Sequence, residues 1–192
     1  MLDKEYWDGK WQVRDTGWDM GSVSPAIADY INQLPHKNIA ILIPGCGNAW
    51  EAEYLLQRGF SNITLLDISQ VAIENLKKKF SNYTQVKIIC EDFFHHQGSY
   101  DLIIEQTFFC AIHPSRRKEY VVKSASLLKE NGRIAGLLFN RQFHQATPPF
   151  GGNTDEYKAL FGTHFNIKEM SICYNSILPR MGTEVFIILI KK

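Results

Sequence analysis

Short apolar segments that read as buried strands alternate with segments of helical spacing along most of the sequence. Ile39 to Ile43 is an unbroken aliphatic run, which suits a strand that is buried on both faces. Further strands are predicted at residues 63–67, 86–90, 102–105 and 134–139, with helices at 25–34, 50–58, 70–80 and 114–128. Because right-handed crossovers place helices on both faces of a parallel sheet, this order predicts an α/β, Rossmann-like, doubly wound fold.

The C-terminal part of the sequence changes character. Thr154 is predicted to cap a short helix that ends near Leu160. Residues 167–173 and 184–190 then read as two strands joined without a helix, so they are expected to pair antiparallel. We therefore expect a mostly parallel, seven-stranded sheet that ends in an antiparallel hairpin, within a single domain spanning residues 1–192.

Composition and charge narrow the class of partner. Lys and Arg total 21 against 20 Asp and Glu, and the net charge of +1 does not favour nucleic acid as a partner. No apolar run approaches the roughly 20 residues that span a bilayer, so no membrane partner is expected. The four cysteines are widely spaced, which favours free thiols in the cytoplasm over a disulfide framework. The histidines lack a matching set of ligands, so no metal site is expected.

The sharpest local motif is Gly45-Cys46-Gly47, which follows the strand at residues 39–43 directly and precedes a predicted helix. Glycines at this position allow a tight turn and the close approach of a ligand to the backbone. A tight turn without a ligand is the alternative. Asp67 ends the next strand, 20 residues after Gly47 by position, where a carboxylate can accept hydrogen bonds from ribose hydroxyls.

The third strand leads into Asp92-Phe93, an acid beside an aromatic ring that together can bind and cover an adenine. These loops follow the carboxyl ends of neighbouring strands, where open α/β sheets bind ligands. The loop lacks the third glycine of the full dinucleotide motif and any Walker-type phosphate loop. A nucleoside-like ligand without phosphates, such as S-adenosylmethionine, therefore fits better than NAD or ATP.

Several segments resemble the thiopurine methyltransferase family, and especially its plant branch of halide and thiol methyltransferases. They are the tryptophan-rich residues 6–11 and 15–19, the Pro-Gly-Cys-Gly motif at 44–47, the phenylalanine- and cysteine-containing stretch 100–112, and residues 148–150 and 179–184. The resemblance implies an S-adenosylmethionine-dependent methyltransferase in which an N-terminal arm, residues 1–23, covers the cofactor. By position it implies cofactor contacts from Trp7, Trp11, Trp18, Gly45, Cys46, Gly47, Asp67, Ile68, Asp92, Phe93 and Gln106.

The methyl acceptor is expected to be a small soft nucleophile, namely a thiol, hydrosulfide or halide. A thiol is already partly ionised at neutral pH and needs little help from a base, and no catalytic residue is assigned. The acceptor pocket is expected beside the methyl group, lined by Phe108, Phe109, Phe139, Arg141 and Arg180. Two alternatives remain open: a non-catalytic module that binds S-adenosylmethionine and regulates a partner, and a methyltransferase that acts on another small molecule. The sequence gives no indication of the oligomeric state.

Overall fold

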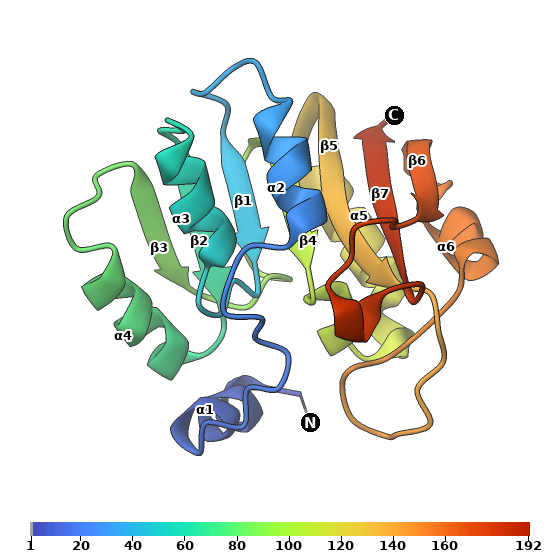
Figure 1. The fold of residues 1–192 in the computed structure, drawn as a ribbon, viewed down its shortest axis with the longest axis horizontal. Helices are drawn as coiled ribbons and strands as arrows, with labels where there is room; N and C mark the ends of the chain where they lie inside the picture. The colour runs from blue at the N-terminus through green and yellow to red at the C-terminus, as the bar shows by residue number, and fades with distance from the viewer. Residues whose placement is uncertain (1) are drawn as a thin grey trace.

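The computed structural model describes residues 2–192, and its strands form one seven-stranded sheet (Figure 1). The strands are β1 (Ile41–Pro44), β2 (Ile63–Asp67), β3 (Val86–Cys90), β4 (Tyr100–Gln106), β5 (Leu128–Phe139), β6 (Phe165–Ile172) and β7 (Glu184–Lys191). The α-helices are α1 (Lys4–Gln12), α2 (Pro25–Asn32), α3 (Trp50–Gln57), α4 (Gln70–Lys79), α5 (Arg117–Leu127) and α6 (Thr154–Phe161).

The strand order across the sheet is β3-β2-β1-β4-β5-β7-β6. The five strands from β3 to β5 pair in parallel, whereas β7 is antiparallel to both of its neighbours, β5 and β6. The predicted α/β class, the mostly parallel sheet of seven strands and the antiparallel C-terminal hairpin are therefore confirmed. The last strand of the sequence lies inside the sheet, between β5 and β6.

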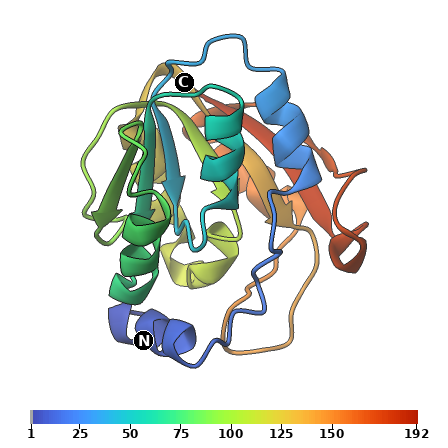
Figure 2. The ribbon, with the colours of Figure 1, turned by 60° about the vertical axis from the view of Figure 1, so that its left-hand side comes forward.

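Alternating residues of the central strands pack into two separate cores, one on each face of the sheet. Leu42 and Ile103 pack with residues of α5 and α6, whereas Ile41 and Ile43 pack with residues of α2, α3 and α4. These side chains are at most 2% exposed, which explains the unbroken apolar character of the central strands. The two layers of helices leave the carboxyl ends of the parallel strands free at one end of the molecule (Figures 1 and 2).

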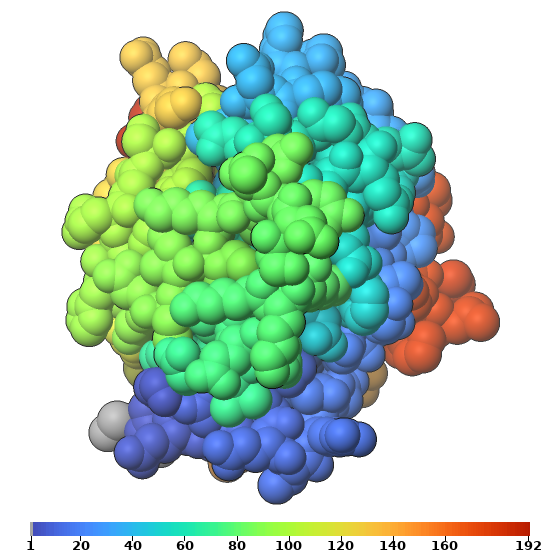
Figure 3. Space-filling view, turned by 90° about the vertical axis from the view of Figure 1, so that its left-hand side faces the viewer, coloured from blue at the N-terminus to red at the C-terminus, as the bar shows by residue number. Residues whose placement is uncertain are grey.

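The N-terminal segment lies at that end of the molecule, beneath α4 (Figures 2 and 3). It begins with α1, a helix that the sequence reading did not predict, since it treated residues 1–23 only as an arm. Asp3 caps α1 by accepting a hydrogen bond from the amide of Tyr6. None of the residues of α1 is fully buried, and the helix lacks the apolar stripe by which a core helix is recognised.

Two further differences from the sequence prediction concern β5 and α6. β5 begins at Leu128, six residues earlier than expected, and Gly132 lies within the strand instead of just past a helix. Asn153, not Thr154, caps α6 by accepting a hydrogen bond from the amide of Glu156. The helix predicted at residues 70–80 is present as α4, and Ser69 caps it, because its hydroxyl accepts the amide of Ala72.

Candidate functional site

The chain turns sharply after β1, in the loop from Gly45 to Ala49. Gly45 and Gly47 have φ angles of +56° and +51°, in the left-handed region that glycine adopts without strain. A Cβ atom on Gly45 would overlap the ring of Phe108, so this glycine also permits close packing between the loop and the segment after β4. The tight strand-to-helix turn that the Gly-x-Gly motif predicts is present, and α3 begins at Trp50.

Asp67, at the end of β2, binds this loop directly. One carboxylate oxygen accepts the amide of Gly47 at 3.0 Å, and the other accepts the amide of Ser69 at 2.9 Å. Burial raises the pKa of Asp67, while hydrogen bonds from these amides and that of Ile68 oppose the rise. Asp67 therefore fixes the shape of the glycine loop, and Ile68 follows it as a half-buried residue.

Asp92 and Phe93 follow β3, and their side chains have different surroundings. Asp92 is half-buried and accepts a hydrogen bond from the amide of Phe94 at 2.9 Å. Phe93 is only 4% exposed and stacks on Tyr120, with 5.4 Å between the ring centroids, and packs edge-on against Phe108. The ring of Phe93 is thus part of the core formed by α5.

Three tryptophans of the N-terminal segment form one aromatic cluster. The ring of Trp18 lies edge-on to Trp7 and Trp11, at 5.6 and 6.0 Å between centroids. Trp11 also faces the glycine loop, since a methyl group on Gly47 would contact its ring. The structure therefore brings all three predicted tryptophans to the loop end of the sheet.

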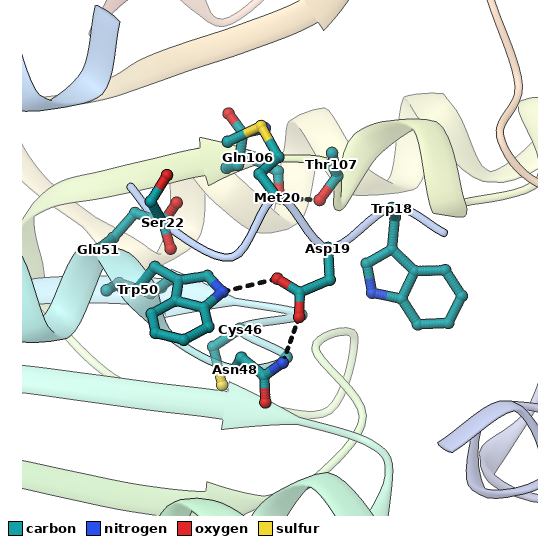
Figure 4. A pocket seen from close by; sticks show the side chains of 13 residues that line it. Trp18, Asp19, Met20, Ser22, Cys46, Asn48, Trp50, Glu51, Gln106 and Thr107 are labelled. Carbon is teal, nitrogen blue, oxygen red and sulfur yellow. Dashed lines mark hydrogen bonds between the residues drawn. The ribbon is translucent and has the colours of Figure 1, made fainter. Parts of the chain in front are cut away.

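Asp19 attaches the N-terminal segment to the loop and to α3 (Figure 4). Its carboxylate accepts hydrogen bonds from the indole N–H of Trp50 at 2.6 Å and from the amide side chain of Asn48 at 2.5 Å. The ammonium group of Lys79 lies 4.0 Å from the centroid of the Trp50 ring and donates to the carbonyl of Asn48. The N-terminal segment, the loop, α3 and α4 are thus connected through Asp19 and Lys79.

A cleft lies between the N-terminal segment, the glycine loop and β4, with an enclosed volume of about 40 Å³. Its lining consists of residues from these three parts and from the start of α3: Trp18, Asp19, Met20, Ser22, Ile43, Gly45, Cys46, Gly47, Asn48, Trp50, Glu51, Gln106 and Thr107. Ligand pockets for small molecules commonly measure about 300–1,000 Å³. In this form the cleft is therefore smaller than a typical pocket for a ligand of nucleoside size.

The cleft presents hydrogen-bond acceptors that lack donors. Within residues 2–192 the buried Oε1 atom of Gln106 has no hydrogen-bond partner, while its Nε2 lies 4.0 Å from the sulfur of Met20. Glu51 is 5% exposed, and burial raises the pKa of its carboxyl group to about 7. Burial also raises the pKa of the Cys46 thiol well above its usual value, so this thiol is neutral. The site is suited to a ligand that donates hydrogen bonds or carries positive charge.

The five residues predicted to form the acceptor pocket fall into different environments. Arg180 donates to the carbonyl of Trp18 at 2.9 Å, lies 3.5 Å from the carboxylate of Glu184, and sits 5.5 Å from the ring centroid of Phe139. Phe108 packs on the glycine loop. These three predicted residues lie near the N-terminal segment or the loop.

The other two predicted acceptor residues are placed differently. Phe109 is 1% exposed and lies in an aromatic core with Tyr120, Tyr157 and Phe161, so it does not line the cleft. Arg141 is exposed, with its guanidinium 4.8 Å from the ring centroid of Phe143.

In the described part of the chain, no helix has the length and apolar character needed to cross a membrane.

The family is identified by a match over nearly the whole chain. The model of the thiopurine S-methyltransferase family matches residues 2–185. The chain belongs to this family. A probable thiol methyltransferase 2 of Arabidopsis thaliana is 31% identical over 185 residues, which cover 93% of this chain and 81% of the plant protein. A thiopurine S-methyltransferase of Acinetobacter baylyi is 26% identical, with 87% of each chain covered.

The fold of this thiopurine S-methyltransferase family member is shared with solved methyltransferases. A Burkholderia thailandensis 1,6-didemethyltoxoflavin-N1-methyltransferase, solved with S-adenosylhomocysteine bound, has a TM-score of 0.82 at 14% identity. The similarity covers 98% of this chain and 87% of that one. The predicted family and the predicted cofactor are confirmed: the protein is a methyltransferase that uses S-adenosylmethionine.

Sequence reasoning missed several residues of the cleft in this family member. Asp19, Asn48 and Trp50 form hydrogen bonds that join residues about 30 positions apart, and Glu51 is a buried carboxylate at the start of a helix. The sequence marks Asp19 only as part of a tryptophan-rich segment. Glu51 carries no signal other than its position, four residues after Gly47.

Proposed function

We propose that this methyltransferase transfers the methyl group of S-adenosylmethionine to the sulfur of a small thiol or hydrosulfide, or to a halide. The observation that carries the proposal is the likeness, over 93% of the chain, to a plant protein named as a probable thiol methyltransferase. The bacterial relative is named for sulfur methylation as well. A thiol suits such a site because a few per cent is already thiolate at pH 7, so the protein does not have to supply a strong base.

We propose that the cofactor lies across the carboxyl ends of β1, β2 and β3, under the N-terminal segment. Asp67 would accept ribose hydroxyls, since its oxygens retain lone pairs beyond those that accept the amides of Gly47 and Ser69. The full proposed set is Trp7, Trp11, Trp18, Gly45, Cys46, Gly47, Asp67, Ile68, Asp92, Phe93 and Gln106. Phe93 would act from the core, by supporting the wall of the site, since its ring is buried.

The sulfonium group of the cofactor supplies an activated methyl group with a good leaving group. The protein then has to hold the acceptor in line with the methyl carbon and to exclude water, which leaves an anion more reactive. Phe108 and Phe139 offer apolar surface for this purpose, near the glycine loop and Arg180 respectively. The positive charge of Arg180 is shared with Glu184 and the carbonyl of Trp18, so we propose that it attracts an anionic acceptor only weakly.

We propose Arg141 as the outer part of the acceptor site, because its guanidinium is exposed on the loop after β5. Phe109 would contribute indirectly, by supporting Phe108 from the core. The location in the cytoplasm, which rests on the cysteine pattern of the sequence, stays a prediction.

A transfer assay with tritium-labelled methyl groups and a panel of acceptors tests the proposed activity. Hydrosulfide, a thiophenol-like thiol and iodide should each accept label from the cofactor in the presence of the wild-type protein. Calorimetry with S-adenosylhomocysteine provides the control that the protein used is competent to bind. Binding without transfer to any acceptor would favour the non-catalytic alternative, and transfer only to an amine or a carboxylate would show that the sulfur-or-halide proposal is wrong.

A further inference from the structure

Glu51 is a buried carboxylate without a donor from any other described residue. It is the second residue of α3, lines the cleft and is 5% exposed. Within residues 2–192 the hydrogen bond that favours its charged form comes from its own backbone amide. Glu53, on the same helix, is instead more exposed and paired with Lys79 at 2.7 Å. A buried carboxylate with few partners is costly to ionise, so a ligand in the cleft that supplied donors would stabilise its charged form.

A second acceptor belongs to the same cleft. The Oε1 atom of Gln106, at the end of β4, is buried and unpaired among residues 2–192. Asp19 lines the cleft too, but both of its oxygens already accept hydrogen bonds, from Trp50 and Asn48. The cleft is thus lined by two acceptors without a donor from another described residue, one of which can be charged, and a cation with several N–H donors would match both.

Only one group of S-adenosylmethionine has this character. The sulfonium is positive but carries no hydrogen, whereas the α-ammonium group of the methionine part is positive and has three N–H donors. The position of Gln106 agrees with this choice, because β4 lies beyond β1 from Asp67, on the side opposite the expected ribose site. We propose that Glu51 binds the α-ammonium group of the cofactor, with Gln106 Oε1 as the second acceptor.

This assignment depends on the cofactor alone and is independent of the proposed methyl acceptor. It also predicts a coupling between cofactor binding and pH. Asp19 from the N-terminal segment raises the pKa of Glu51 and Lys79 from α4 lowers it, while burial is the largest cause of a pKa near 7. Cys46 faces Glu51 as a neutral thiol, and β4 contributes the uncharged Gln106. An ammonium group bound to Glu51 favours the ionised carboxylate, so a proton should leave when the ligand binds below about pH 7.

Calorimetry with two ligands tests the assignment without any methyl transfer. The ligands are S-adenosylhomocysteine and its analogue in which hydrogen replaces the α-amino group. Glu51→Gln should weaken binding of S-adenosylhomocysteine about 10- to 100-fold, as expected for a lost hydrogen bond between charged groups. It should change binding of the deaminated analogue less than about twofold. Glu74 is an exposed carboxylate on α4 that interacts with Gln70. Glu74→Gln serves as the matched control and should change the affinity for neither ligand.

The same titrations supply the outcomes that would overturn the proposal. Unchanged affinity for S-adenosylhomocysteine in Glu51→Gln, or an equal loss for both ligands, would remove Glu51 from the ammonium site. Proton release on binding at pH 6.5 can be measured by calorimetry in buffers of different ionisation enthalpy. The wild-type protein should release protons when it binds S-adenosylhomocysteine, whereas Glu51→Gln should not. Equal release by both proteins would also contradict the assignment. Gln106→Met provides a second variant. It should likewise weaken binding of S-adenosylhomocysteine and leave binding of the deaminated analogue nearly unchanged. Since no methyl acceptor is present in these titrations, a result against the Glu51 assignment is separate from a result against the proposed sulfur transfer.

Discussion

Two buried glutamates show how the surroundings of a side chain separate a structural role from a ligand-binding one. Glu105 accepts the amides of Phe108 and Phe109 and the hydroxyl of Tyr120, so it orders the turn after β4, and these three donors favour its charged form. Glu51 is also buried, at 5% exposed against 0% for Glu105, but lacks such donors from the rest of the described chain. Burial raises the pKa of each to about 7, yet only Glu51 lines the cleft.

These pKa values predict how stability changes with pH. Between the usual glutamate pKa of about 4.3 and about 7, the folded protein holds protons that the unfolded chain has released. The free energy of unfolding should therefore fall as pH rises from 5 to 7.5. Glu51→Gln removes one of the two contributions, so its decline should be shallower than that of the wild type. Urea unfolding at several pH values measures this, and parallel curves for the two proteins would contradict it.

The residues that sequence reasoning found are those with a local signal. Gly45 and Gly47 stand between a strand and a helix, and Asp67 stands at a strand end, so the chain itself marks them. Asp19 and Glu51 carry no such mark. Their roles depend on contacts across the fold and on burial, which exist only once α3 and the N-terminal segment have packed together.

At the level of elements, α1 is held by polar contacts at the start of α4 as well as by the tryptophan cluster. The carboxylate of Asp8 accepts the hydroxyl of Ser69 at 2.7 Å and the amide of Val71 at 3.2 Å, which satisfies donors at the N-terminus of α4. None of the side chains of α1 is fully buried. Elements of this kind open at low free-energy cost, which suits a segment that we expect to move when a cofactor enters.

Removal of the N-terminal segment is therefore expected to affect binding more than folding. A protein lacking residues 1–18 should keep the circular dichroism spectrum of the sheet and bind S-adenosylhomocysteine much more weakly, because the tryptophan cluster is lost. Asp19→Ala is the finer variant, since it removes only the hydrogen bonds to Trp50 and Asn48. Calorimetry compares the three proteins. Equal affinity in the truncated and full-length proteins would mean that the segment only packs against the sheet.

The early start of β5 shows where local patterns mislead at the element level. Residues 129–132, Lys-Glu-Asn-Gly, read as a turn that ends a helix. In the structure Leu128 pairs with Tyr100, Leu102 pairs with Arg133, and the register shifts between these pairs. Asn131, with a φ of +60°, allows the polar residues to bulge out of the strand. Strand pairing with β4 decides this boundary, and that partner is 30 residues away in the sequence.

Across the whole molecule, Arg180 joins the two ends of the chain. It binds the carbonyl of Trp18 in the N-terminal segment and the buried carboxylate of Glu184 at the start of β7. The sequence alone predicts that Arg180 affects the methyl acceptor and leaves cofactor affinity nearly intact. These contacts predict a second effect, on cofactor affinity, because the same guanidinium holds the N-terminal segment in position.

Arg180→Met should thus lower kcat/KM for the acceptor and also weaken cofactor binding. It should cost about 1–3 kcal/mol of stability, since Glu184 is left buried without its charged partner. Steady-state kinetics, calorimetry and urea unfolding measure the three effects. Arg58→Met, at the exposed end of α3, is the matched control and should leave all three nearly unchanged. A variant at Arg180 with altered kinetics but wild-type cofactor affinity would restrict this residue to the acceptor side.

The interior position of β7 has a consequence for synthesis on the ribosome. β6 precedes β7 in the sequence but lies beyond it in the sheet, so β6 has no neighbour to pair with until β7 has emerged and inserted beside β5. Until then β5 has an open edge and β6 is wholly unpaired, and open strand edges are the surfaces most prone to pairing with other chains. A ribosome that stalls or terminates before residue 184 would therefore release a product prone to aggregation, even though most of the sheet is already encoded.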